Sequence, residues 1–161
     1  MLLKKLDQSF YDENTHLKEA LDLKNGVWIK GKTRGYGIVL IELNELTFGV
    51  PVRSHIRHKA SYITERSSQP GILGKGLDYS KALLLTKPDY ISSMPFKIDT
   101  RQHELLKNKA IFISKSFEKY VTKYVQAIRK ADSNVLTSNE YRYTTLQNYH
   151  IELGIEDLTT K

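Results

Sequence analysis

The side chains that could do chemistry gather in one short stretch of this chain, residues 53–59, with the sequence RSHIRHK. A hydroxyl group at Ser54 stands beside two imidazoles, His55 and His58, and three cationic side chains, Arg53, Arg57 and Lys59. Metal-free cleavage of RNA needs groups of these kinds. The substrate supplies its own nucleophile, the 2′-hydroxyl, so the protein must take its proton, stabilise the charge on the phosphorane and protonate the leaving oxygen. This stretch is therefore the first candidate for a functional site.

The sequence offers fewer of the residues that metal-dependent chemistry needs. The carboxylates are scattered, with Asp78 isolated and Asp99 placed to cap a helix. His55 and His58 could hold a metal ion only with partners that the sequence does not display. The chain has no cysteine, which excludes thiolate ligands, thiol nucleophiles and a disulfide-linked partner. We expect neither a metal site nor a cofactor.

The charge balance points to a polyanionic partner. The 161 residues carry a formal net charge of +7. A small basic domain commonly binds nucleic acid, and the alternative explanation of the charge is a merely soluble surface. Cations also alternate with glycines in residues 30–35, KGKTRG. Close backbone approach to a phosphate chain would explain this pattern, and a solvated turn would explain it equally well.

The element that must position the basic stretch is a hairpin over residues 35–54. The run Ile38–Ile41 is apolar at consecutive positions, which predicts a strand buried on both faces at the centre of a sheet. A turn at Asn44-Glu45 leads to a second apolar run, Leu46–Val52. The candidate residues therefore follow the end of a buried strand.

The rest of the chain divides into strands and then helices. We expect an edge strand at residues 2–6, a helix capped by Asp12 or Asn14 that carries Leu17, Ala20 and Leu21, and a flexible loop over residues 67–76. Further strands are expected at residues 27–29, 61–64, 82–86 and 90–91. A helical segment over residues 100–130 should break near 108–110, and a last helix should run over residues 139–154 with its tyrosines packed in the core.

This order predicts one α+β domain over residues 1–161. Residues 1–98 are expected to form a strongly bent antiparallel sheet or small barrel with one early helix, residues 99–154 a helical layer, and residues 155–161 a frayed tail. The sequence shows no signal peptide and no apolar run long enough to span a bilayer, so we expect a cytoplasmic protein without a membrane partner.

Several of these segments are similar, in order, to a known family. The chain has a GIVLI strand at residues 37–41, a strand FGVPVRS at residues 48–54, GLDYSK at residues 76–81 before a hydrophobic strand, and two closing helical segments. In this arrangement it resembles the type III toxin–antitoxin ribonucleases. The resemblance covers most of the chain and is closest to the TenpN branch of the ToxN/AbiQ-like group.

The resemblance implies a compact SH3-like antiparallel β-barrel of the MazF/Kid type with added helices. It also implies a toxin that cuts A-rich cellular or phage RNA without a metal and leaves a 2′,3′-cyclic phosphate and a 5′-hydroxyl, with a role in phage defence. Its inhibitor would be a pseudoknot antitoxin RNA, processed by the toxin from a tandem-repeat transcript and bound in a closed, ring-like protein–RNA assembly.

The same resemblance suggests roles for individual residues. Ser54 falls on the serine of the family, and the cation before the GIVL strand is matched by Arg34 or by Lys32. Arg53 departs from the usual threonine, and an arginine there could instead clamp the phosphorane. The residues expected to bind RNA are Lys30, Tyr36, His55, Arg57, His58, Lys59, Lys75 and Lys81.

Two other kinds of function stay open at this point. A non-catalytic RNA-binding module explains the charge and the barrel equally well, and it needs no chemistry from Ser54. A protein-interaction domain with acidic partners is a third explanation, which salt-sensitive RNA binding would contradict.

Overall fold

The computed structural model describes residues 1, 3–29, 37–95 and 100–155, and it confirms an α+β structure in which strands come first and most helices follow. The main antiparallel sheet contains β1 (Leu3–Leu6), β4 (Ile38–Leu43), β5 (Leu46–Ile56), β6 (Ser61–Arg66), β7 (Gly74–Asp78), β8 (Leu83–Leu84) and β9 (Ile91–Pro95). A small second sheet pairs β2 (Leu23–Lys24) with β3 (Val27–Trp28). The helices are α1 (Gln8–Glu13), α2 (Thr100–Asn108), α3 (Ala110–Lys130) and α4 (Ser133–Leu136), with 3-10 turns η1 (Tyr79–Lys81), η2 (Pro88–Tyr90) and η3 (Thr145–Asn148).

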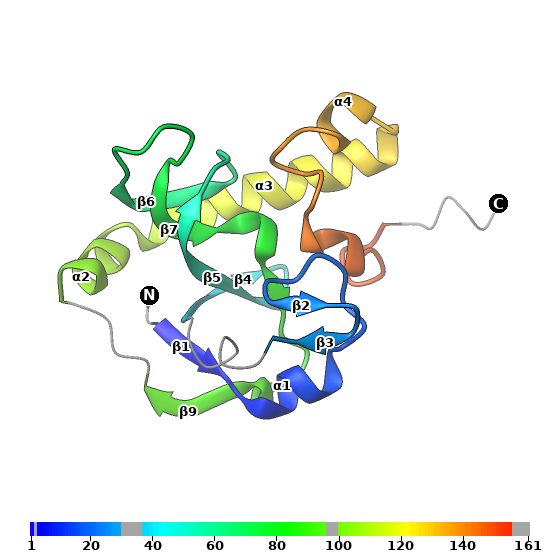
Figure 1. Cartoon of the computed structure of the whole chain (residues 1–161). Coiled ribbons are helices and arrows are strands. Elements are labelled where there is room, and N and C mark those ends of the chain that lie inside the picture. The colour runs from blue at the N-terminus through cyan, green and yellow to red at the C-terminus, as the bar shows by residue number, and fades with distance from the viewer. Residues whose placement is uncertain (2, 30–36, 96–99, 156–161) are drawn as a thin grey trace.

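The main sheet is open over the described residues. Its strand order is β6-β7-β5-β4-β1-β9, with β8 added beside β5, and no pairing joins the end strands β6 and β9. The expected closed barrel is therefore not formed by these strands. The first strand is also not an edge, because β9 pairs with its outer side through Lys4↔Pro95 and Leu6↔Ile91. Figure 1 shows β9 beyond β1, and the long helix α3 across the opposite side of the sheet.

The central hairpin was predicted correctly. Strands β4 and β5 pair without interruption from Ile38↔Pro51 to Leu43↔Leu46, and β4 lies inside the sheet between β5 and β1. Both turn residues have positive φ, 50° at Asn44 and 67° at Glu45. Tight hairpin turns of this kind match the twist of the strands, so the turn forms even though its second residue is not glycine.

Strand β5 is longer than the sequence suggested, which changes the setting of the candidate residues. It continues to Ile56, so Arg53, Ser54 and His55 lie within a strand and not after one. Its partner β7 begins at Gly74, inside the segment expected to be a loop. The glycine at position 76 allows a close approach of β6, because a Cβ atom there would lie 1.9 Å from the Tyr62 carbonyl oxygen.

Two helix predictions were wrong. The first helix, α1, begins earlier than expected and ends at Glu13, so Leu17, Ala20 and Leu21 lie outside it. Asp7 caps this helix by accepting a hydrogen bond from the Ser9 N–H at 2.9 Å. The expected last helix is replaced by α4, a series of turns and η3. Tyr141 in this region is buried as expected, with its ring stacked on that of Tyr120 at a centroid distance of 4.6 Å.

The long helical segment was predicted well. It is divided at Lys109 into α2 and α3, and α3 buries a stripe of apolar and aromatic residues against the sheet, among them Ile113, Phe117 and Val121. Residues from the strands and from α3 belong to the same buried hydrophobic cluster. No helix in the part of the chain that the structure describes combines the length and apolar character needed to cross a membrane.

Candidate active site at the end of β5

A bulge in β5 brings a hydroxyl and an imidazole together at the surface. The ladder with β7 passes from Arg53↔Gly76 to Ile56↔Gly74, so β5 holds one more residue than its partner in this interval. Consecutive side chains of a regular strand point to opposite faces, whereas bulges re-aim them and are frequent beside active sites. Here the Ser54 Oγ lies 2.9 Å from the His55 Nδ1, and both residues are exposed.

Beneath this surface lies a buried carboxylate that sequence analysis took for an isolated one. Asp78, the last residue of β7, is fully buried, and its Oδ2 accepts a hydrogen bond from the Arg53 Nη1 at 2.9 Å. Its Oδ1 accepts from the Ser80 hydroxyl at 2.6 Å and lies 3.1 Å from the His58 Nε2. We call Asp78, Arg53, His58 and Ser80 the Asp78 cluster. It fixes the guanidinium group of Arg53, whose side chain is still 38% exposed.

The hydrogen bonds of His58 indicate its tautomer. The backbone N–H of Ala60 donates to the Nδ1 at 3.2 Å, so this nitrogen acts as an acceptor and carries no proton. The proton of the neutral ring is then on Nε2, where it points to the Asp78 carboxylate. The side chain is only 13% exposed. His58 therefore mainly supports the loop after β5, and little of its side chain faces solvent.

The electrostatics of the Asp78 cluster favour the ionised carboxylate. Burial by itself raises the pKa of Asp78, but hydrogen bonds from His58, Ser80 and Arg53 outweigh it and bring this pKa below its ordinary value. The carboxylate is therefore charged at neutral pH, and the Arg53 guanidinium beside it is its main permanent counter-charge.

Lys81 is a buried cation behind the same surface. Its ammonium group donates to the backbone carbonyl oxygens of Glu19 at 2.7 Å and Tyr143 at 2.9 Å, and its side chain is 13% exposed. Burial lowers the pKa of Lys81, while the nearby carboxylates of Glu19 and Asp78 act in the opposite direction. With Arg53 it lines a pocket of about 400 Å³ whose other wall is the segment from Glu19 to Lys24.

The remaining predicted residues are spread around this surface. Arg57 and Lys59 are exposed on the turn after β5. Lys75 is half-buried, and it is the β7 residue between the partners of Arg53 and Ile56, opposite the bulge. Four further predicted residues lie outside the described residues: Lys30, Lys32, Arg34 and Tyr36.

Sequence reasoning missed Asp78 and Ser80 as members of the site. A signal was present, since Asp78 is followed two residues later by a serine, the spacing of a local cap. Asp78 indeed accepts from the Ser80 N–H at 3.0 Å and so starts η1. The partners on β5 and in the following turn are distant in sequence, and only the pairing of β5 with β7 brings them to this carboxylate.

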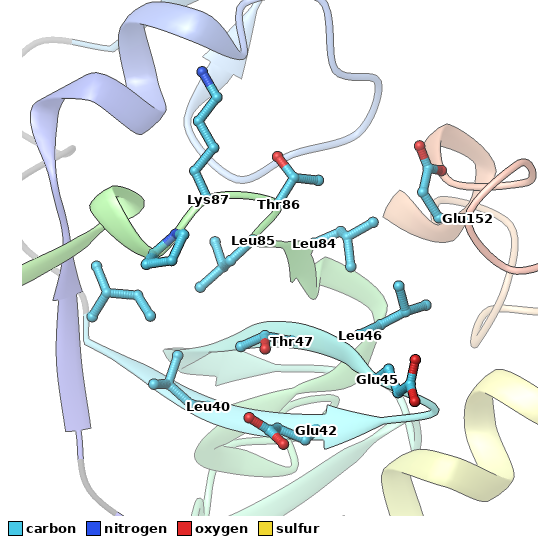
Figure 2. A pocket seen from close by; sticks show the side chains of 12 residues that line it. Leu40, Glu42, Glu45, Leu46, Thr47, Leu84, Leu85, Thr86, Lys87 and Glu152 are labelled. Atoms are coloured by element: carbon cyan, nitrogen blue, oxygen red, sulfur yellow. The ribbon is translucent and has the colours of Figure 1, made fainter.

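A second pocket, of about 510 Å³, lies at the other end of β5 (Figure 2). Leucines of the β4–β5 hairpin and of β8 form its floor, and the carboxylates of Glu42, Glu45 and Glu152 stand around it. Lys87 also lines it, but its ammonium group is paired with Glu13. Leu46 and Arg53 are seven residues apart, about 23 Å along a strand. The acidic end of β5 is therefore well separated from the basic one.

Within the described ranges, no group of three or more histidine, aspartate, glutamate or cysteine side chains is placed to hold a metal ion. The candidate site instead combines an exposed Ser54–His55 pair, a guanidinium fixed by a buried carboxylate, and neighbouring lysines. Comparisons of the chain with protein-family models, with curated proteins and with solved structures found no match. The family resemblance therefore rests on the sequence motifs and their order.

Proposed function

We propose that this chain is the toxin of a type III toxin–antitoxin system, a metal-independent endoribonuclease that acts in the cytoplasm. The observation that carries the proposal is the bulged end of β5, where Ser54 and His55 form an exposed hydrogen-bonded pair directly after Arg53 in the chain, and Asp78 holds the guanidinium of Arg53 in place. Hydroxyl, imidazole and guanidinium are the groups that transesterification of RNA requires. The sequence resemblance supplies the biological setting, and on that resemblance alone we relate the open antiparallel sheet to the SH3-like barrel of MazF/Kid toxins.

The geometry suggests how the three groups divide the reaction. When the Nδ1–H of His55 donates to the Ser54 Oγ, the Nε2 of the ring is free to take the proton of the 2′-hydroxyl. The Ser54 hydroxyl can then donate its own proton to a non-bridging oxygen of the phosphorane. Arg53, held from behind by Asp78, offers a charged donor to the same group. The 2′-oxygen attacks phosphorus and the bond to the 5′-oxygen breaks. The leaving 5′-oxygen takes a proton from water and the His55 imidazolium releases the proton that it took, so a cyclic phosphate and a 5′-hydroxyl result.

The partner in this proposal is a folded antitoxin RNA, held in a closed protein–RNA assembly. Arg57 and Lys59 extend the cationic surface beyond the bulge, and both are exposed. Such side chains bind phosphates without reading sequence, so they would hold the folded part of the RNA while the site at β5 holds its single-stranded end. Lys30, Lys32, Arg34 and Tyr36 remain proposed contributors on the sequence resemblance alone.

The test compares Ser54→Ala with Ser68→Ala, a matched change at another exposed serine. Induction of the wild-type chain and of Ser68→Ala should arrest growth, and Ser54→Ala should not, while all three unfold at the same urea concentration. Purified wild-type protein should cut RNA in excess EDTA and leave 2′,3′-cyclic phosphate ends. Cleavage that stops on chelation and returns with magnesium would refute the proposed chemistry. An Ser54→Ala protein that arrests growth like the wild type would refute the proposed site.

A non-catalytic RNA-binding module is the alternative that the same experiment resolves. Such a protein would bind RNA with a steep dependence on salt but would leave the RNA intact. RNA binding without cleavage, together with growth unaffected by the wild-type chain, would favour this second function.

A further inference from the structure

The pocket beside Arg53 has the features of a site for one nucleotide. Its volume of about 400 Å³ falls within the range of small-molecule sites, roughly 300–1,000 Å³. Arg53 and Lys81 supply positive charge on one side, and the side chains of Leu21, Leu23 and Ile29 supply apolar surface. A nucleotide needs both, because its phosphate is anionic and the faces of its base are apolar.

The opposite wall of the pocket is held in a fixed shape. Glu19 and Asp22 adopt left-handed backbone conformations, with φ of 65° and 62°, which are unfavourable for residues other than glycine. Such conformations persist where surrounding contacts enforce them, and they are common at ligand sites. Here Lys81 binds the Glu19 carbonyl oxygen, and the side-chain amide of Asn148 both donates to the Lys18 carbonyl and accepts from the Lys18 N–H, each at 2.8 Å.

The polar groups of this wall should bind some bases better than others. Glu19 and Asp22 are among the residues that line the pocket, with the Glu19 carboxylate 3.9 Å from the Lys81 ammonium, and a carboxylate can only accept hydrogen bonds. Adenine, cytosine and guanine each carry an exocyclic amino group that can donate to it, whereas uracil offers a single N3–H between two carbonyl oxygens. A carboxylate that accepts from this N3–H meets both carbonyl oxygens, so the wall should disfavour uracil.

We infer that this pocket binds one nucleotide next to the cleaved bond and selects a base with an exocyclic amino group through Glu19 and Asp22. The position of this nucleotide next to a cleaved bond rests on the proposed function, whereas the pocket and its base preference are independent of it. Arg53 links the two sites, because it lines the pocket and lies in β5 directly before Ser54. A phosphate held by Arg53 would place the neighbouring base at the mouth of the pocket.

Binding of 3′-nucleoside monophosphates to the intact chain, followed by NMR titration, tests the inference without any need for cleavage. The adenine and cytosine nucleotides should bind about tenfold more tightly than the uracil nucleotide, the effect of one hydrogen bond to a charged acceptor. Asp22→Asn suits the positive φ of this position and adds an amide donor, so it should remove most of this difference. Leu21→Trp should fill the pocket and weaken all the nucleotides at least tenfold.

Glu118→Gln is the matched control, since it removes an exposed carboxylate on α3 and should leave every affinity unchanged. Equal affinities for all nucleotides, or Asp22→Asn and Leu21→Trp proteins that bind like the wild type, would overturn the inference. Either result with RNA cleavage intact would leave the proposed function standing. Selective nucleotide binding without any cleavage would instead support the pocket and refute the enzyme.

Discussion

Replacing Asp78 by alanine should lower the free energy of unfolding by about 3 kcal/mol. The side chain is fully buried and has four polar partners: the Ser80 N–H at 3.0 Å, the Ser80 hydroxyl at 2.6 Å, the Arg53 Nη1 at 2.9 Å and the His58 Nε2 at 3.1 Å. Alanine would leave the two donors of Ser80 without their charged acceptor in a buried region, whereas the His58 Nε2 keeps the Ser80 Oγ as a neighbour at 3.2 Å. Each of the two lost bonds to a charged acceptor should cost about 1.5 kcal/mol.

The pair with Arg53 should add little to this loss. Its side chain is 38% exposed, so water can solvate the guanidinium once the carboxylate is gone. For a domain of this size, a loss of about 3 kcal/mol corresponds to a fall in Tm of about 6–12 °C. The measurement is urea denaturation followed by the fluorescence of Trp28, the single tryptophan. Glu118→Ala, which removes an exposed carboxylate from α3, should change stability by no more than about 0.5 kcal/mol.

The pH dependence gives this prediction a second, independent readout. The folded-state pKa of Asp78 is below the ordinary value of 3.8, so its ionisation stabilises the fold above that pH and the contribution is lost as pH falls through the folded-state pKa. The stability difference between the wild type and Asp78→Asn should therefore shrink on acidification below about pH 4. A loss under 1 kcal/mol in Asp78→Ala at neutral pH would show that the Asp78 cluster does not hold β5, β7 and η1 together.

Two further predictions concern the sheet and the aromatic core. Gly76→Ala should destabilise the β6–β7 pairing by several kcal/mol, because its Cβ would overlap the Tyr62 carbonyl oxygen; normal urea stability in this variant would contradict the close strand approach. Burial raises the pKa of Tyr124 to about 12 in the folded protein. The neutral phenol therefore contributes to folding stability below pH 10, and this contribution to stability is lost as pH rises toward 12. The urea midpoint should thus fall steeply above pH 10, less so in Tyr124→Phe, and equal slopes in the two proteins would refute the assignment.

Local signals allowed part of the fold to be predicted from the sequence. The β4–β5 hairpin follows from two apolar runs around Asn44-Glu45, and the division of the helical segment near Lys109 follows from its length. The wrong helix over residues 139–154 shows the limit of such signals. Tyr141 and Tyr149 recur at helical spacing, but they are buried from turns and η3, with Tyr141 stacked on Tyr120 of α3. Packing against another element produced the same spacing as a helix would.

The candidate residues on β5 could be named from the sequence, but Asp78, Ser80 and the arrangement of the site could not. The basic stretch after the hairpin was identified by composition alone. The length of β5, its bulge and the role of Asp78 depend on pairing with β7, which no local pattern of β5 contains. A single register shift decides whether Ser54 and His55 point apart or meet, because neighbouring strand residues otherwise face opposite sides.

A carboxylate is poorly suited to a surface that is proposed to bind RNA, since it repels phosphate. Asp78 avoids this conflict because it is fully buried and accepts hydrogen bonds from three other residues. Its charge is thus largely compensated before RNA arrives, and Arg53, with its side chain 38% exposed, is the most accessible member of the cluster. An unsupported arginine would lose much of its rotamer freedom on binding a phosphate, at a cost of up to about 2 kcal/mol. Folding has already fixed Arg53 through Asp78, so the proposed site would meet the phosphorane with a donor in place.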